Sequence, residues 1–106
     1  MNRDRIEQLL IFRKETPQDP FLIYALATEY KSEEPITAKE YFDILLNNYP
    51  DYVGTYFHAA SLYAEHFERS KAEDIYLKGI EKAAQLNDLH ALKELKNAYQ
   101  NFQFEE

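Results

Sequence analysis

The residues whose side chains are best suited to catalysis or metal binding are three histidines and one serine. His58, His66 and His90 could bind a metal, and Ser61 follows His58 by three residues, on the same side of a helix. However, His58 and His66 are eight residues apart, which is too far for one ion without other ligands. Amides inside a helix are already paired, so none remains beside Ser61 to form an oxyanion hole. We therefore expect no metal site and no serine nucleophile.

Other catalytic and cofactor-binding patterns are also weak. Glu73 and Asp74 are adjacent, so in a helix they point to different sides and cannot act as a catalytic pair. Gly54 and Gly79, the two glycines, are 25 residues apart, which argues against a phosphate-binding loop. The chain has no cysteine, so disulfides, thiolate catalysis and cysteine-bound metals are excluded. The sequence predicts a protein that is not an enzyme and has no cofactor.

The composition favours one soluble domain. The 106 residues fit a single domain, and 45% of them are hydrophobic, which is enough to form a core. Acidic residues outnumber basic ones by 19 to 12, and the resulting net charge of −7 repels phosphate backbones. No apolar run approaches the roughly 18 residues of a membrane span, and the start, MNRDRIEQLLIF, does not resemble a signal peptide. We expect no nucleic-acid or membrane partner, and a cytoplasmic location.

Helical periodicity dominates the chain and predicts six amphipathic helices and no strand. Prolines and polar residues mark the expected boundaries, and residues 103–106 are expected to fray. The expected helices span roughly 3–15, 20–31, 35–48, 52–66, 69–84 and 88–102. The expected capping groups are Asp19, Asp51, and Asn87 or Asp88, together with the pairs Asp4/Glu7 and Ser70/Glu73.

A quartet of residues recurs along the chain. Its members occupy positions i, i+3, i+4 and i+7, which is one helical face, and successive quartets are offset by 33 and 36 residues. Pro17 and Pro50 are also 33 residues apart, and each precedes its quartet by six. The quartets are Ile23, Leu26, Ala27, Tyr30; Tyr56, Ala59, Ala60, Tyr63; and Leu92, Leu95, Lys96, Tyr99. Small residues that would let paired helices approach closely are Ala27, Ala38, Ala60, Ala72 and Gly79.

This pattern resembles the tetratricopeptide repeat, a helix-turn-helix unit of about 34 residues. Residues 53–84 match best, although Ala59, Ala60 and Ala84 stand where the family prefers leucine, glycine and proline. Ile23 stands where the family has tryptophan. The resemblance implies an all-α solenoid, a right-handed superhelix of antiparallel helix pairs. The alternative is an ordinary six-helix bundle whose repeat spacings match by chance.

The resemblance also implies how one domain, 1–106, is organised. It has an N-terminal half repeat at 1–17, full repeats at 18–50 and 51–84, and a C-terminal capping helix at 85–106. Lys96 supports the capping assignment because it occupies the slot filled earlier by Ala27 and Ala60. A small residue is not required there if no further helix packs against it.

Members of this family bind extended or helical segments of partner proteins in a concave groove, so the resemblance implies a protein–protein interaction module. Residues beside each quartet would line the groove, with Tyr24 and Phe57 as aromatic anchors. Alternatively, both rings are covered by neighbouring helices as ordinary core. The expected groove residues are Tyr24, Thr28, Lys31, Phe57, His58, Ser61, Glu65, Lys93 and Asn97.

The partner is an unknown protein or peptide. Some family members clamp the carboxylate terminus of chaperones with lysine, asparagine and arginine side chains, but here only Lys93 and Asn97 have suitable chemistry. We therefore do not expect such a clamp.

A second hypothesis is self-association through the last helix, which would make the protein a monomer or weak homodimer. Leu92, Leu95, Tyr99 and Phe102 form an apolar stripe on that helix. Packing within the chain could use the whole stripe, or Phe102 and Phe104 could remain as an adhesive edge.

Overall fold

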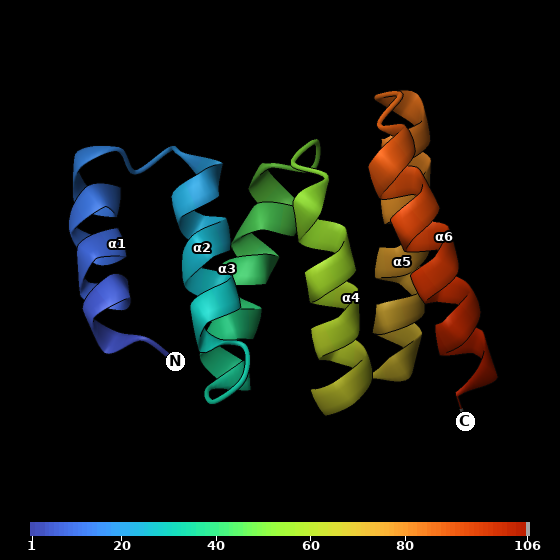
Figure 1. Cartoon of the computed structure of the whole chain (residues 1–106), viewed down its shortest axis with the longest axis horizontal. Helices are drawn as coiled ribbons and strands as arrows, with labels where there is room; N and C mark the ends of the chain where they lie inside the picture. Colours follow the sequence, from blue (N-terminus) through green and yellow to red (C-terminus); the bar gives the residue numbers. More distant parts are fainter. Residues whose placement is uncertain (106) are drawn as a thin grey trace. The chain divides into compact units, whose positions relative to one another are not determined.

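The computed structural model describes residues 1–105 and contains six α-helices in that range (Figure 1). None of these residues lies in a β-strand. The expected all-α, six-helix fold is confirmed, and no helix end differs from its expected position by more than two residues. The helices are α1 (Arg3–Glu15), α2 (Pro20–Tyr30), α3 (Pro35–Asn48), α4 (Gly54–His66), α5 (Arg69–Gln85) and α6 (Leu89–Phe104).

Two of the expected helix caps are confirmed. The Asp19 carboxylate accepts a hydrogen bond of 3.0 Å from the Phe21 amide at the start of α2. At the start of α6, the Asp88 carboxylate accepts one of 3.0 Å from the Ala91 amide. Both satisfy amides of the first turn, which have no partner within the helix.

The other three expected caps are wrong. Asn2, rather than the Asp4/Glu7 pair, caps α1 by accepting a hydrogen bond from the Arg5 amide at 3.0 Å. Asp51 lies too far ahead of α4, which begins at Gly54 after a turn, and instead pairs with the Lys82 ammonium at 3.1 Å. Ser70 cannot cap α5 because the helix has already begun at Arg69.

The first compact unit, Met1–Tyr49, contains α1, α2 and α3. Helix α2 packs against both α1 and α3. The rings of Tyr30 on α2 and Tyr41 on α3 stack with their centroids 5.9 Å apart. Ala27 and Ala38 are fully buried, as expected for small residues where helices pack closely. One hydrophobic cluster of this unit comprises Ile6, Leu9, Leu22, Ala25 and Leu26.

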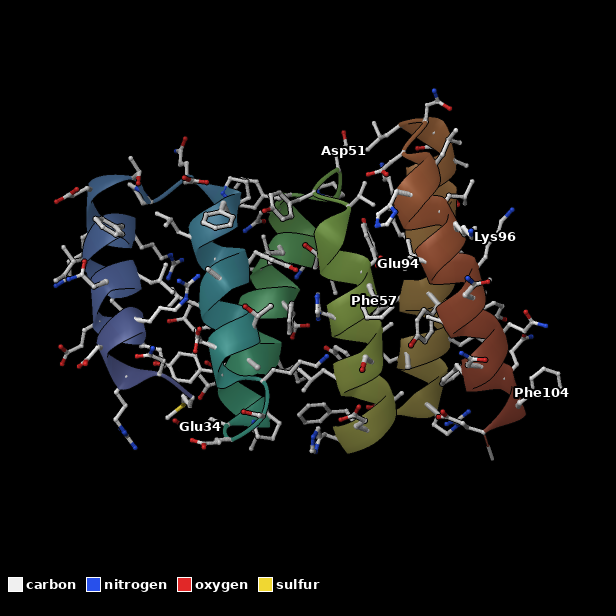
Figure 2. All side chains as sticks on the ribbon, viewed as in Figure 1. Glu34, Asp51, Phe57, Glu94, Lys96 and Phe104 are labelled. Carbon is white, nitrogen blue, oxygen red and sulfur yellow. The ribbon has the colours of Figure 1, made fainter. Side chains whose placement is uncertain are left out.

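The second compact unit begins at Pro50 and contains α4, α5 and α6. Helix α5 packs against both α4 and α6, and α4 also contacts α6 directly. The first two quartets are largely buried, whereas Lys96 in the third is exposed. Figure 2 shows Lys96 projecting from α6 on the side away from α4. The expected division into repeats stays a prediction.

Candidate functional site

Three of the expected groove residues belong to the first unit. Tyr24 and Thr28 are half-buried on α2, and Lys31 is the C-cap residue that follows the end of this helix at Tyr30. The Thr28 hydroxyl donates a hydrogen bond of 3.0 Å to the Ala25 carbonyl, so its proton is used within its own helix. The expected role of Tyr24 and Phe57 as aromatic anchors stays a prediction.

Four expected residues lie on α4 in the second unit. Phe57 is half-buried, and its ring meets the His58 imidazole edge-on with the centroids 5.4 Å apart. Figure 2 shows Phe57 on the side of α4 that faces α6. One helical turn further on, the Ser61 hydroxyl donates a hydrogen bond of 3.4 Å to the Glu65 carboxylate. The side of α4 that carries Phe57 therefore continues into a pair of polar groups.

A hollow of about 190 Å³ lies between α4 and α6, and we call it the α4–α6 hollow. Two of its lining residues, Ser61 and Glu65, are expected groove residues. Alanines on both helices keep the space open, because they have no side chain long enough to fill it. The full lining is Ser61, Ala64 and Glu65 from α4, Tyr76 from α5, and Ala98, Asn101, Phe102 and Glu105 from α6.

Lys93 and Asn97 are exposed on α6 and do not line this hollow. The sequence-based prediction selected equivalent positions on each helix, on the assumption that these positions form one shared surface. A space between two neighbouring helices is instead walled by the sides that face each other. On α6 that side carries Ala98, Asn101 and Glu105, which sequence reasoning missed although their spacing of three and four residues marks one helical face.

Tyr76 is the residue of α5 that lines the α4–α6 hollow. The residue is 6% exposed, and its ring packs against Phe102 and Tyr99 with centroid distances of 5.4 and 6.0 Å. Burial raises the pKa of Tyr76 above its ordinary value of 10.0, and the negative charges of Glu105 and Glu65 raise it further. The hydroxyl is therefore within electrostatic reach of both carboxylates that line the hollow.

The end of α6 is held in place by Arg69. Its Nη2 atom donates hydrogen bonds to the carbonyls of Phe102 and Glu105, at 2.9 and 2.7 Å, and its guanidinium lies 4.1 Å from the Phe102 ring centroid. The expectation that the chain frays from residue 103 is wrong for the described residues, because α6 continues to Phe104. Glu106 lies outside the described residues.

The apolar stripe on α6 is largely used within the chain. Leu95 and Phe102 are buried, and the Tyr99 hydroxyl donates a hydrogen bond of 3.1 Å to the Glu73 carboxylate on α5. Phe104, in contrast, is 79% exposed, and Figure 2 shows it at the end of α6. Phe102 is thus part of the core of the second unit, and of the proposed adhesive edge only Phe104 is exposed.

Two of the histidines, His66 and His90, are exposed and lie near carboxylates. His90 approaches the Glu94 carboxylate at 3.1 Å, and His66 approaches Glu65 at 3.8 Å. Within residues 1–105, no three His, Asp or Glu side chains are grouped so that they could hold a metal ion. Over the same residues, no helix has both the length and the apolar character needed to cross a membrane.

The sequence matches no protein-family model, and no curated protein matches it either. Solved structures do match. The crystal structure of a tetratricopeptide repeat domain protein from Salinibacter ruber is 38% identical, with a TM-score of 0.78, and the match covers 84% of this chain and 100% of that one. Its solution structure matches with a TM-score of 0.79 at 38% identity, covering 85% of this chain and 92% of that one.

A third structure, a Bordetella parapertussis protein in solution, has a TM-score of 0.78 at 18% identity. That match covers 92% of this chain and 86% of the other, and it concerns the fold alone. The Salinibacter protein carries the family assignment, because it is similar in sequence as well as fold over its whole length. This chain therefore belongs to the tetratricopeptide repeat family.

Proposed function

We propose that the protein is a scaffold that binds a segment of a partner protein without chemical change. Tetratricopeptide repeat domains are generally protein-interaction modules and are typically non-enzymatic. The observation that carries the proposal is the α4–α6 hollow, because it joins an open space to polar groups on two neighbouring helices. In the first unit, Tyr24, Thr28 and Lys31 are proposed to contact the same partner.

The chemistry of α4 suits the recognition of an extended polypeptide. Phe57 offers part of an aromatic ring, which can pack against an apolar side chain of the partner. Ser61 and Asn101 carry hydroxyl and amide groups that can donate to and accept from a peptide backbone. On the exposed part of α6, Lys93 and Asn97 are proposed to make polar contacts at the margin.

Self-association through α6 has less support. Two residues of its apolar stripe, Leu95 and Phe102, are buried against their own chain. Phe104 is a single exposed ring, and isolated exposed apolar residues are common on protein surfaces. Sedimentation at several concentrations separates the two functions, because a chain that assembles through α6 forms more dimer as concentration rises.

The proposed function is tested by comparing captured partners. The full chain is used as bait in a lysate of its source cell, alongside Tyr24→Ala, Phe57→Ala and the double variant. Leu77→Ala is the matched control, because Leu77 is an exposed apolar residue on α5 that lies outside the hollow. Circular dichroism first establishes that each variant is folded.

We expect the wild-type chain and Leu77→Ala to retain the same partners, and the double variant to lose them. Because Tyr24 and Phe57 lie in different units, the single variants show which unit contributes more. Identical partner sets for the double variant and the wild-type chain would refute the role of these two rings.

A further inference from the structure

We propose that the α4–α6 hollow receives an arginine side chain from the partner segment. This inference rests on the proposed function, and it names the chemistry of the partner at one position. The hollow lies wholly within the second unit, and its lining includes two carboxylates, Glu65 and Glu105. None of its lining residues is a lysine, arginine or histidine.

An independent feature of the hollow is Tyr76, which lines it from α5. The side chain is more than nine-tenths buried, yet its hydroxyl has no hydrogen-bond partner among residues 1–105. The hydroxyl oxygen itself is not enclosed, because among residues 1–105 the buried side-chain atoms without a partner are Arg13 Nε and Thr55 Oγ1. A donor that enters the hollow can therefore pair with the Tyr76 oxygen, which can accept a hydrogen bond.

The size and wall chemistry of the hollow suit a single long side chain. A volume of about 190 Å³ is smaller than the roughly 300–1,000 Å³ of typical small-molecule sites. Ala64 and Ala98 provide apolar walls for the methylene groups, and Phe102 provides an aromatic one. The carboxylates of Glu65 and Glu105 only accept hydrogen bonds, and the Tyr76 oxygen can also accept one. Together they match the guanidinium of arginine, a planar group with five N–H donors.

The basic side chains of Arg69 and His66 lie near the hollow, and neither belongs to its lining. The Nη2 atom of Arg69 is used on two backbone carbonyls and its guanidinium lies against the Phe102 ring, outside the hollow lining. His66 approaches Glu65 only at 3.8 Å and is itself exposed. Ser61 donates to the Oε1 atom of Glu65, which orients this carboxylate, while the His66 imidazole lies 3.8 Å from the Oε2 atom, beyond hydrogen-bond distance.

The test is a titration of the isotopically labelled full chain, followed by the NMR signals of its backbone amides. The probe is the peptide acetyl-Gly-Arg-Gly-amide, and the control probe has citrulline in place of arginine, which keeps the shape but removes the charge. We expect the arginine peptide to produce saturable shifts at Ala64, Ala98 and Asn101. Citrulline should bind about five- to tenfold more weakly, since charge-assisted hydrogen bonds are the stronger ones.

Variants distinguish the hollow from general attraction to an acidic protein. Glu65→Gln and Glu105→Gln are each expected to weaken arginine binding about two- to fivefold, as for exposed ion pairs, and the double variant about tenfold. Tyr76→Phe keeps the ring and should weaken binding about threefold by removing the hydroxyl. Asp74→Asn, which removes an exposed charge outside the hollow, should stay within about twofold of wild type.

The inference is overturned if both peptides shift the same amides with equal affinity, or if the Glu65→Gln, Glu105→Gln variant binds like wild type. It is also overturned if the shifts spread over the surface instead of clustering at the hollow. These outcomes leave the proposed function standing if the double alanine variant still loses its captured partners. Conversely, arginine binding at the hollow together with unchanged capture would refute the proposed role of the two rings alone.

Discussion

Gly79 on α5 lies directly against Tyr56 on α4. A Cβ atom added at Gly79 would lie 2.5 Å from the Cβ of Tyr56, 2.9 Å from its Cγ and 3.2 Å from the Leu95 Cδ1 on α6. Backbone atoms and the first side-chain atom cannot move independently of their helix, so the absent side chain sets how closely α4 and α5 approach. One glycine thus determines the packing of the helices whose sides form the α4–α6 hollow.

Gly79→Ala is expected to destabilise the protein although alanine is the better helix former. The gain in helix propensity is about 1 kcal/mol, while overpacking costs about 1–3 kcal/mol, and here the obstruction is an atom fixed to the α4 backbone. We expect a net loss of about 1–2 kcal/mol in the free energy of unfolding, measured by urea denaturation. Gly54→Ala is the matched control: Gly54 is exposed, and the change should stay within about 0.5 kcal/mol. A Gly79→Ala variant as stable as the control would contradict this packing.

The existence and order of the helices could be predicted because their signals are local. Apolar spacing, Pro20 and Pro35 at helix starts, and the repeat offset all lie within short segments of sequence. The small residues were also predicted, but the sequence could not say which atom each one meets. That Gly79 meets Tyr56 depends on packing between two helices, which periodicity alone does not specify.

Asn87 is expected to tolerate glycine and to reject a β-branched residue. Its φ angle is 57°, in the left-handed region, and this turn lets the Asp88 amide donate to the Ala83 carbonyl at 2.9 Å and the Asn87 amide to Ala84 at 3.2 Å. Both bonds satisfy carbonyls at the end of α5. Asn87→Gly should leave the free energy of unfolding within about 0.5 kcal/mol, whereas Asn87→Val should lower it by about 1–2 kcal/mol. Equal stability of the two variants in urea denaturation would rule out this account.

The candidate site was harder to predict than the fold. Ser61 and Glu65 were found because they share the side of α4 that follows from the quartet spacing. Asn101 and Glu105 were missed because the relevant side of α6 depends on how α6 packs beside α4. Tyr76 was missed for a further reason. It is a buried core residue, and only the structure shows that it also lines the hollow.

The protein is expected to lose stability in alkaline solution, and Tyr56 should contribute. Its hydroxyl donates a hydrogen bond to the Pro50 carbonyl at 2.5 Å. Burial raises the pKa of Tyr56 above 10.0, and the charges of Asp51 and Glu81 add to the effect. As the pH rises past 10.0, the unfolded chain loses this proton first, so the native state binds more protons and the free energy of unfolding falls.

Thermal unfolding between about pH 8 and pH 11 checks this expectation. Tyr56→Phe should be less stable than wild type near neutral pH, by about 0.5–1.5 kcal/mol for the lost hydrogen bond. Its melting temperature should then fall less steeply with pH. Some slope should remain, because the pKa values of Tyr30, Tyr76 and Tyr99 are also raised, in each case with burial as the largest cause. Parallel curves for the variant and the wild type would exclude a contribution from Tyr56.

Arg69→Met is expected to loosen the end of α6 and, with it, one wall of the α4–α6 hollow. Methionine keeps much of the side-chain bulk but loses both hydrogen bonds to the α6 carbonyls and the contact of a cation with the Phe102 ring. Lys71→Met, at an exposed position on the same helix, controls for the change in charge. Amide hydrogen exchange at Phe104 and Glu105 should be about tenfold faster in Arg69→Met than in wild type or the control, equivalent to about 1.4 kcal/mol of local stability.

Arg69→Lys should be intermediate, because an ammonium can donate to the carbonyls but lacks the planar guanidinium that can also lie against a ring. If exchange is unchanged in Arg69→Met, the end of α6 is held by the packing of Phe102 on Tyr76 alone, and Glu105 would keep its place in the hollow without Arg69.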